Sequence, residues 1–167
     1  MRLFAALALL AASLLFGYSL VASDRRALRL LRSLIDSLGL MRSEISARLT
    51  PIPDCAAMLS ETGSVECRAF YSALAAALDA LGELEFSSIW SAAVRTLELP
   101  AEARAALDVL GASLGRYSAA EQCAAIDLCA ERLRRINDDM ERRMAASTRL
   151  KLALPACAAL LVGVLLY

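Results

Sequence analysis

The segment LFAALALLAASLLFGYSLVA, residues 3–22, contains no charged residue, and neither does LALPACAALLVGVLLY, residues 152–167. Apart from Arg2, every charged side chain lies between residues 24 and 151. The core of a bilayer is about 30 Å thick and is crossed by roughly 20 apolar residues of helix. We therefore expect an N-terminal transmembrane anchor (1–23), a central domain (24–151) and a C-terminal transmembrane anchor (152–167).

Basic residues flank both hydrophobic segments on the side of the central domain. The first segment is followed by Arg25, Arg26, Arg29 and Arg32, and the second is preceded by Arg142, Arg143, Arg149 and Lys151. The second segment is short, and Arg149 and Lys151 help it to span by extending to the membrane surface. The positive-inside rule then places the central domain in the cytoplasm and both termini outside.

A cleavable signal peptide is the alternative interpretation of the first segment. Val21-Ala22-Ser23 loosely fits the small-residue pattern of a cleavage site. However, the apolar run is longer than the core of a usual signal peptide, and the arginines that follow would resist translocation. An exported helical domain is the function that this alternative implies.

The composition excludes several classes of function. The chain holds 18 basic and 18 acidic residues, and no basic stripe suited to nucleic acid stands out. Histidine is absent, which removes the commonest general base and the commonest metal ligand. The five cysteines are odd in number and lack paired spacing, so we interpret them as small buried hydrophobes. We expect no catalytic residue, no cofactor and no bound metal.

The central domain has the periodicity of an all-α protein. From Asp24 to Leu49, apolar residues recur at three- and four-residue steps or their sum, as on one face of a helix: Leu28, Leu31, Ile35, Leu38, Ile45 and Leu49. Thr50-Pro51-Ile52-Pro53 ends this helix, because proline lacks the N–H that a helix interior requires. No stretch alternates with the period of a strand.

Turn and capping residues divide the remainder into five more helices. We expect a short helix over 54–59, a third from Ser64 to Leu81 and a fourth from Ser87-Ser88, with Trp90 as a core residue. A fifth begins near Pro100 and stops at Gly115. The sixth starts at the capping box of Ser118 and Glu121 and has no breaker before Pro155. The fold class is therefore an antiparallel bundle of about six helices flanked by transmembrane helices.

Two groups of charged residues were weighed as sites. Asp138, Asp139 and Glu141 point in different directions on a helix and lie among arginines, which favours a solvated ion-pair face over a metal site. In the first helix, Arg25, Arg26, Arg29, Asp36 and Glu44 form a charged face opposite the leucine stripe. Such a face is typical of solvation and of attraction to anionic headgroups, and it also suits a cytoplasmic partner.

The order of these features resembles the stage III sporulation protein AB family of endospore-forming bacteria over nearly the whole chain. The likeness is carried by Arg26, Leu30, Leu34, Glu44-Ile45, Thr50-Pro51-Ile52-Pro53, Trp90, Leu110-Gly111, Leu114-Gly115 and Gln122. The chain departs from the family at Ser118, where an Asp is usual, and in the last anchor. That anchor has Pro155 and a single glycine, Gly163, in place of two Leu-Gly-type pairs.

The resemblance implies a function that periodicity and charge do not supply. The family is part of a secretion-like complex of the mother cell, built across the membranes around the forespore and required for forespore development. Its members are similar to the inner-membrane platform proteins of type II secretion and type IV pilus systems. The resemblance therefore implies a two-pass membrane protein that works with other membrane subunits and a cytoplasmic secretion-type ATPase.

We therefore expect a non-enzymatic platform subunit that docks this ATPase, with Arg26, Arg29 and Glu44 as candidate contacts. The alternative is a structural membrane organiser that self-associates through the leucine stripe, as a homo-oligomer, and recruits no ATPase.

Overall fold

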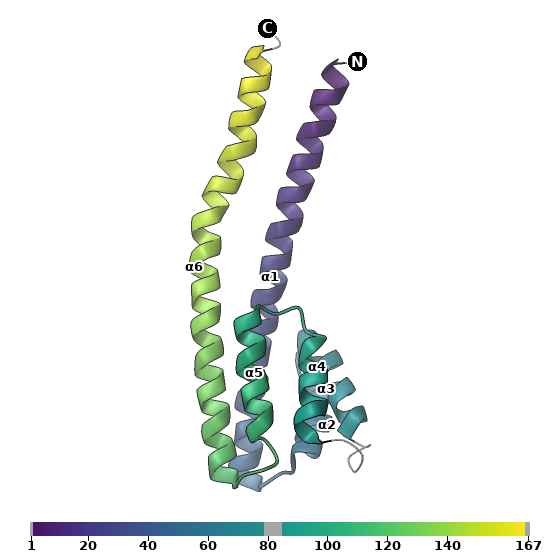
Figure 1. Cartoon of the computed structure of the whole chain (residues 1–167), viewed down its shortest axis with the longest axis vertical. Helices are drawn as coiled ribbons and strands as arrows, with labels where there is room; N and C mark the ends of the chain where they lie inside the picture. Colours follow the sequence, from purple (N-terminus) through teal and green to yellow (C-terminus); the bar gives the residue numbers. More distant parts are fainter. Residues whose placement is uncertain (1, 79–84, 166–167) are drawn as a thin grey trace. The chain divides into compact units, whose positions relative to one another are not determined.

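The computed structural model is helical throughout the elements it describes. It describes the backbone of residues 2–78 and 85–165, and side chains over 22–78 and 85–146. Six helices follow one another: α1 (Arg2–Arg48), α2 (Ile52–Thr62), α3 (Val65–Leu78), α4 (Phe86–Arg95), α5 (Ala101–Ser113) and α6 (Ala119–Leu165) (Figure 1). No strand occurs in the described ranges. The prediction of an all-α chain with about six helices is confirmed.

The chain divides into two compact units. The central unit, Arg29–Asn137, contains the end of α1, all four short helices and the start of α6, and the terminal unit contains Met1–Leu28 and Asp138–Tyr167. Most of both expected anchors lies outside the residues whose side chains are described. In the part of the chain that could be searched, no helix combines the length and the apolarity needed to cross a membrane.

The leucine stripe of α1 forms one wall of the core in the central unit. Leu31, Leu38 and Met41 are fully buried, and Leu34 and Ile45 nearly so. Met41 therefore continues the stripe between Leu38 and Ile45, where its flexible thioether fills the space. Ile35 is only half-buried. The stripe is used inside the unit and is not an exposed surface.

The end of α1 differs from the prediction at one residue. Leu49 lies outside the helix, is 71% exposed and has a φ of 55°. Thr50 precedes Pro51 and is therefore driven from helical geometry, so α1 cannot continue. Leu49 takes the left-handed conformation that commonly follows the end of a helix. The predicted break at Thr50-Pro51-Ile52-Pro53 is confirmed, and α2 starts directly within it at Ile52.

The short helices pack in sequence, α2 on α3, α3 on α4 and α4 on α5. Within the central unit, Figure 1 shows them gathered beside the opposed end of α1 and start of α6. Val65 is apolar and starts α3, but it is 78% exposed. It opens the helix, and the buried positions of α3 begin two residues later at Cys67. The expected end of this helix at Leu81 lies outside the described residues.

The turn between α5 and α6 has the predicted signals. Gly115 has a φ of 75°, which glycine adopts without steric cost, and the helix before it ends at Ser113. The capping box is confirmed, because Glu121 N–H donates to Ser118 Oγ at 3.4 Å and Ser118 N–H donates to a Glu121 carboxylate oxygen at 3.0 Å. The Ser118 hydroxyl also donates to this carboxylate at 2.7 Å, and this bond, with the one from the Ser118 N–H, holds the pKa of Glu121 below its ordinary value.

Trp90 is the centre of the core, as predicted, and is completely buried. Its indole N–H donates to the Leu107 carbonyl at 2.7 Å, which ties α4 to α5. Its ring meets Phe70 edge to face, with the ring centroids 5.7 Å apart, so that α3 joins the same contact. On its other side the ring lies against Gly111, where a Cβ would overlap three ring atoms.

Three further polar contacts join helices across the core. Ser37 of α1 and Tyr71 of α3 share a hydrogen bond of 2.7 Å, and both side chains are buried. Cys129 of α6 donates to the Ala106 carbonyl of α5 at 3.5 Å. At the surface, Arg42 of α1 holds Asp127 of α6 at 2.6 Å. Each long helix is therefore tied to its neighbours by defined atoms as well as by apolar packing.

Replacing Gly111 with alanine is expected to destabilise the protein by about 2 kcal/mol. The new methyl must displace a buried indole, and overpacking of this kind outweighs the better helix propensity of alanine. Thermal unfolding of the full chain in detergent, followed by Trp90 fluorescence, measures the change.

Gly39→Ala is the matched control for this substitution. Gly39 is also inside a helix, but nothing lies within 4 Å of a Cβ placed there. Alanine should therefore raise the free energy of unfolding by about 0.5–1 kcal/mol. Equal effects of the two substitutions would contradict the contact described between Trp90 and Gly111.

Candidate functional site

A pocket of about 390 Å³ lies where the α1–α2 turn meets the α5–α6 turn. Its walls are formed by the 49–53 turn, by Phe86 at the start of α4, and by Gly115, Ala119 and Gln122. These segments are far apart in sequence and meet only in the folded unit. The pocket lies at the ends of α1 and α6 that are remote in sequence from both hydrophobic segments.

Leu49 gives this pocket an apolar rim with an unusual backbone. Its N–H donates to the Ile45 carbonyl at 3.2 Å, so it occupies the left-handed position at the end of a helix where glycine is usual. A branched side chain in this conformation costs about 1–2 kcal/mol. The result is a large, exposed apolar side chain beside an apolar pocket.

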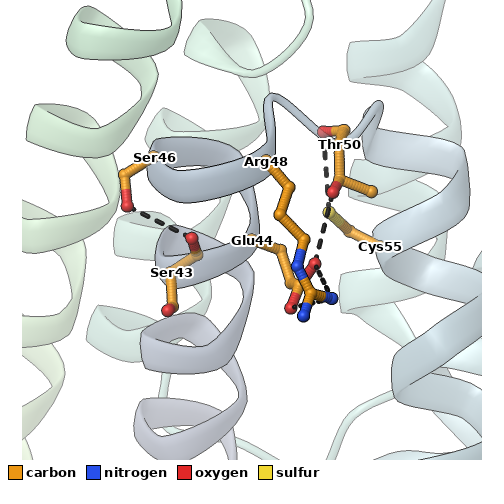
Figure 2. A network of polar contacts seen from close by, with 6 residues as sticks. All are labelled: Ser43, Glu44, Ser46, Arg48, Thr50 and Cys55. Atoms are coloured by element: carbon orange, nitrogen blue, oxygen red, sulfur yellow. Dashed lines mark hydrogen bonds and ion pairs between the residues drawn. The ribbon is translucent and has the colours of Figure 1, made fainter.

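A network of polar contacts between α1 and the start of α2 supports the turn at residues 49–53 (Figure 2). Glu44 accepts hydrogen bonds from Arg48 and from the Thr50 hydroxyl, each at 3.3 Å. Figure 2 also shows the Cys55 thiol, at the start of α2, directed to the Thr50 carbonyl, 3.7 Å away. The Glu44 carboxylate therefore fixes the position of Thr50 relative to α1, and its side chain remains 21% exposed.

Gln122 supports the opposite wall of the pocket. Its Nε2 donates to the Tyr117 carbonyl at 2.7 Å, and its Oε1 accepts from the Gly115 N–H at 3.5 Å. A single side chain thereby closes the loop between α5 and α6. The Thr50–Pro53 turn was predicted as a helix break and Gln122 was noted only as part of a family pattern, and the structure brings them to the same pocket.

The three residues predicted as partner contacts do not form one cluster. Glu44 lies beside the pocket, as described. Arg29 lies earlier on α1, where its guanidinium is 3.9 Å from Glu66 of α3 and its side chain is 56% exposed. Arg26 is exposed and belongs to the terminal unit. By helical rise, Arg29 and Glu44 are about 22 Å apart along α1.

The pocket residues were missed by sequence reasoning, although some signals were present. Leu49 was assigned to the buried stripe because its spacing fitted a continuing helix. Phe86 and Ala119 carried no motif at all. Ile45, the Thr-Pro turn, Gly115 and Gln122 stood out for other reasons, and nothing in their spacing indicated that they meet.

The thiols and the phenol of the core are poorly suited to chemistry. Burial raises the pKa of Cys55 and of Cys67 to about 11 and that of Cys129 to about 12. Burial also raises the pKa of Tyr71 above its ordinary value. A thiol becomes a nucleophile or a metal ligand as the thiolate, which these environments disfavour. Among the described residues, no group of three or more potential metal-binding side chains is found.

The fold and the pocket define a class of protein: an all-α six-helix protein whose central bundle presents an apolar pocket at its turn end. The sequence model of stage III sporulation protein AB matches residues 2–167. The chain belongs to the stage III sporulation protein AB family, and is thus a sporulation protein.

A solved structure described as stage III sporulation protein AB has the same fold. It superimposes with a TM-score of 0.64 at 21% sequence identity, over 72% of this chain and 97% of that one. At this identity the likeness shows the fold alone. No curated protein matches the chain.

Alkaline pH is expected to destabilise the central unit. The thiols of the unfolded chain lose their protons from about pH 9, whereas the buried thiols of the folded chain keep theirs to about pH 11 or 12. The unfolded state then binds fewer protons, so the free energy of unfolding falls as pH rises through this window. Unfolding temperatures at pH 8 and pH 10.5 measure the effect.

The triple variant C55A/C67A/C129A is the control for this titration. It lacks the three thiols but keeps Tyr71, whose raised pKa acts in the same direction, and all other titrating groups. Its stability should decline less steeply over the same interval. An identical decline in the variant and in the wild type would exclude the thiols as the cause.

Proposed function

We propose that this protein is a non-enzymatic platform subunit of a secretion-like sporulation complex. Residues 3–22 and 152–167 anchor it in the membrane around the forespore, and the central unit, on the mother-cell side, docks a cytoplasmic secretion-type ATPase. Other membrane subunits of the complex are its further partners, and it requires no cofactor.

The observation that carries the docking proposal is Leu49. An exposed apolar side chain in a strained conformation is retained only where the surrounding structure over-determines it, and such positions cluster at binding sites. The pocket beside it provides an apolar cleft with two polar side chains, Thr50 and Gln122, that can fix the orientation of a bound segment. We propose that the ATPase inserts an apolar side chain here.

The place of this pocket in the chain supports a protein partner over lipid. Its lining belongs to the central unit and is remote in sequence from both hydrophobic segments. In the proposed topology the central unit is cytoplasmic, so the proposed occupant is a cytoplasmic protein.

Two of the expected contacts fit this proposal. Glu44 positions Thr50 in the wall of the pocket, and Arg29 offers a half-exposed guanidinium farther along α1. A partner domain of about 30 Å reaches both, since Arg29 and Leu49 are about 30 Å apart by helical rise.

Self-association through the leucine stripe is the alternative function, and the packing of the stripe weighs against it. Leu31, Leu34 and Leu38 are buried within the central unit, so two copies could use them only after the bundle opens. The molecular mass of the full chain in detergent, measured by light scattering, distinguishes a monomer from an oligomer.

Leu49→Gly is expected to separate binding from stability. Glycine relieves the left-handed strain, so the protein should become more stable by about 0.5–1 kcal/mol. At the same time the apolar rim is lost, and affinity for the ATPase should fall at least about ten-fold, as for loss of a central apolar anchor. Co-purification and titration of the ATPase with the full chain in detergent measure this.

Val65→Ala is the matched control for Leu49→Gly. Val65 is equally apolar and even more exposed, but it lies away from the pocket at the start of α3. Its truncation should leave binding unchanged. If Leu49→Gly binds the ATPase as tightly as wild type, the pocket is not the docking site.

Charge reversal at Arg29 should weaken the same complex. Arg29→Glu places a carboxylate beside Glu66 and removes the half-exposed cation, and a rim charge of this kind typically changes association rate and salt dependence. We expect a two- to ten-fold loss of affinity at low salt and less at high salt.

Arg134→Glu is the comparison for Arg29→Glu, because Arg134 is an exposed arginine on α6. It should bind the ATPase as the wild type does. An equal loss in both variants would indicate a general charge effect and would remove Arg29 from the contact surface.

A further inference from the structure

Four arginines of the terminal unit have exposed side chains. Arg25 and Arg26 lie on α1, and Arg142 and Arg143 lie on α6. Among the described residues, none of the four forms a hydrogen bond or an ion pair, in contrast to Arg42 with Asp127 and Arg48 with Glu44. Their charges are therefore available to a partner outside the chain.

Along α6, the two arginines lie nearer to the hydrophobic segment than the exposed acidic residues do. Arg142 and Arg143 lie between that segment and the exposed Asp138 and Asp139. The two acids are about 20 Å from residue 152 by helical rise, more than twice the screening length of about 8 Å at physiological ionic strength. The nearest acids to the two segments, Asp24 and Glu141, are half-buried.

The helices are continuous through these residues, so each arginine has a defined depth. Arg25 and Arg26 follow residue 22 by about 5–6 Å of helical rise, and Arg143 precedes residue 152 by about 14 Å. The headgroup layer on each side of a bilayer is about 5–7 Å deep. Arg25 and Arg26 therefore reach phosphate groups directly, and Arg142 and Arg143 lie within about one screening length of them.

We propose that Arg25 and Arg26, supported by Arg142 and Arg143, form a binding surface for anionic phospholipid headgroups. The inference rests on the part of the proposed function that places residues 3–22 and 152–167 in a bilayer. The planar guanidinium group pairs with phosphate oxygens through two parallel N–H groups. The protein selects anionic over zwitterionic lipid, and this contact fixes the depth of both long helices at the membrane surface.

The test measures which lipids the full chain retains. Wild-type protein and variants are purified in detergent with equal amounts of phosphatidylglycerol and phosphatidylcholine, and the bound lipids are quantified by mass spectrometry. The wild type should be enriched in phosphatidylglycerol. In R25Q/R26Q the enrichment in phosphatidylglycerol should fall about five-fold for each arginine removed. In R142Q/R143Q it should fall by a smaller factor. Added salt at 0.5 M should reduce the enrichment.

Arg134→Gln is the matched control for the lipid assay. Arg134 is exposed on the same helix as Arg142, but it belongs to the central unit and is separated in sequence from the hydrophobic segment by the exposed Asp138 and Asp139. The variant Arg134→Gln should be enriched in phosphatidylglycerol to the same degree as the wild type. If R25Q/R26Q is folded by circular dichroism and still retains phosphatidylglycerol as the wild type does, the proposal is overturned. An equal loss in Arg134→Gln overturns it as well.

Failure of the lipid proposal is distinguishable from failure of the proposed function. No ATPase is present in the lipid assay, so the docking proposal is tested separately. Membrane insertion is tested first by resistance of the protein to carbonate extraction. If the chain is extracted, the anchoring part of the proposed function fails, and the same variants are compared by flotation with vesicles of either lipid. Equal flotation with the two lipids then overturns the lipid proposal, and selective flotation with phosphatidylglycerol supports it.

Discussion

The contact between the Trp90 ring and Gly111 constrains the whole central unit. The ring needs an approach to α5 that only a glycine permits, and its N–H then reaches the Leu107 carbonyl one turn earlier. Phe70 brings α3 to the same ring. Since α2 packs on α3, and α5 is joined to α6 through Cys129, the positions of the short helices follow from this one aromatic contact.

The pocket at the turn end depends on this arrangement, because its walls come from separate helices. Phe86 begins the helix that carries Trp90, and Gly115 follows the helix that carries Gly111. The distance between these two walls is therefore set by the contact in the core. The remaining wall is the strained turn at Leu49, which Glu44 and Thr50 hold in place. Core packing thus provides the rigidity that a strained, exposed residue requires.

Sequence predicted the parts of this structure that local chemistry decides. Pro51, Gly115 and the Ser118–Glu121 box each act within a few residues, so the helix breaks were found at or near their observed positions. The exposure of Val65 and the left-handed turn at Leu49 were not found. Both depend on how a helix end meets the rest of the unit, and periodicity treats such residues like any other apolar position. The pocket was not predicted from the sequence for the same reason, since its residues meet only after the helices pack.

Several of the bonds that join helices end on a main-chain carbonyl. Trp90 uses that of Leu107, Cys129 that of Ala106, and Cys123 that of Arg42, with the sulfur 3.8 Å from the oxygen. Every residue type carries this acceptor, so the accepting position is free to change its side chain without breaking the link. Such links tolerate sequence divergence at the accepting position, because only the donating residue must be kept. The shared fold of two chains at 21% identity is the outcome that this arrangement allows.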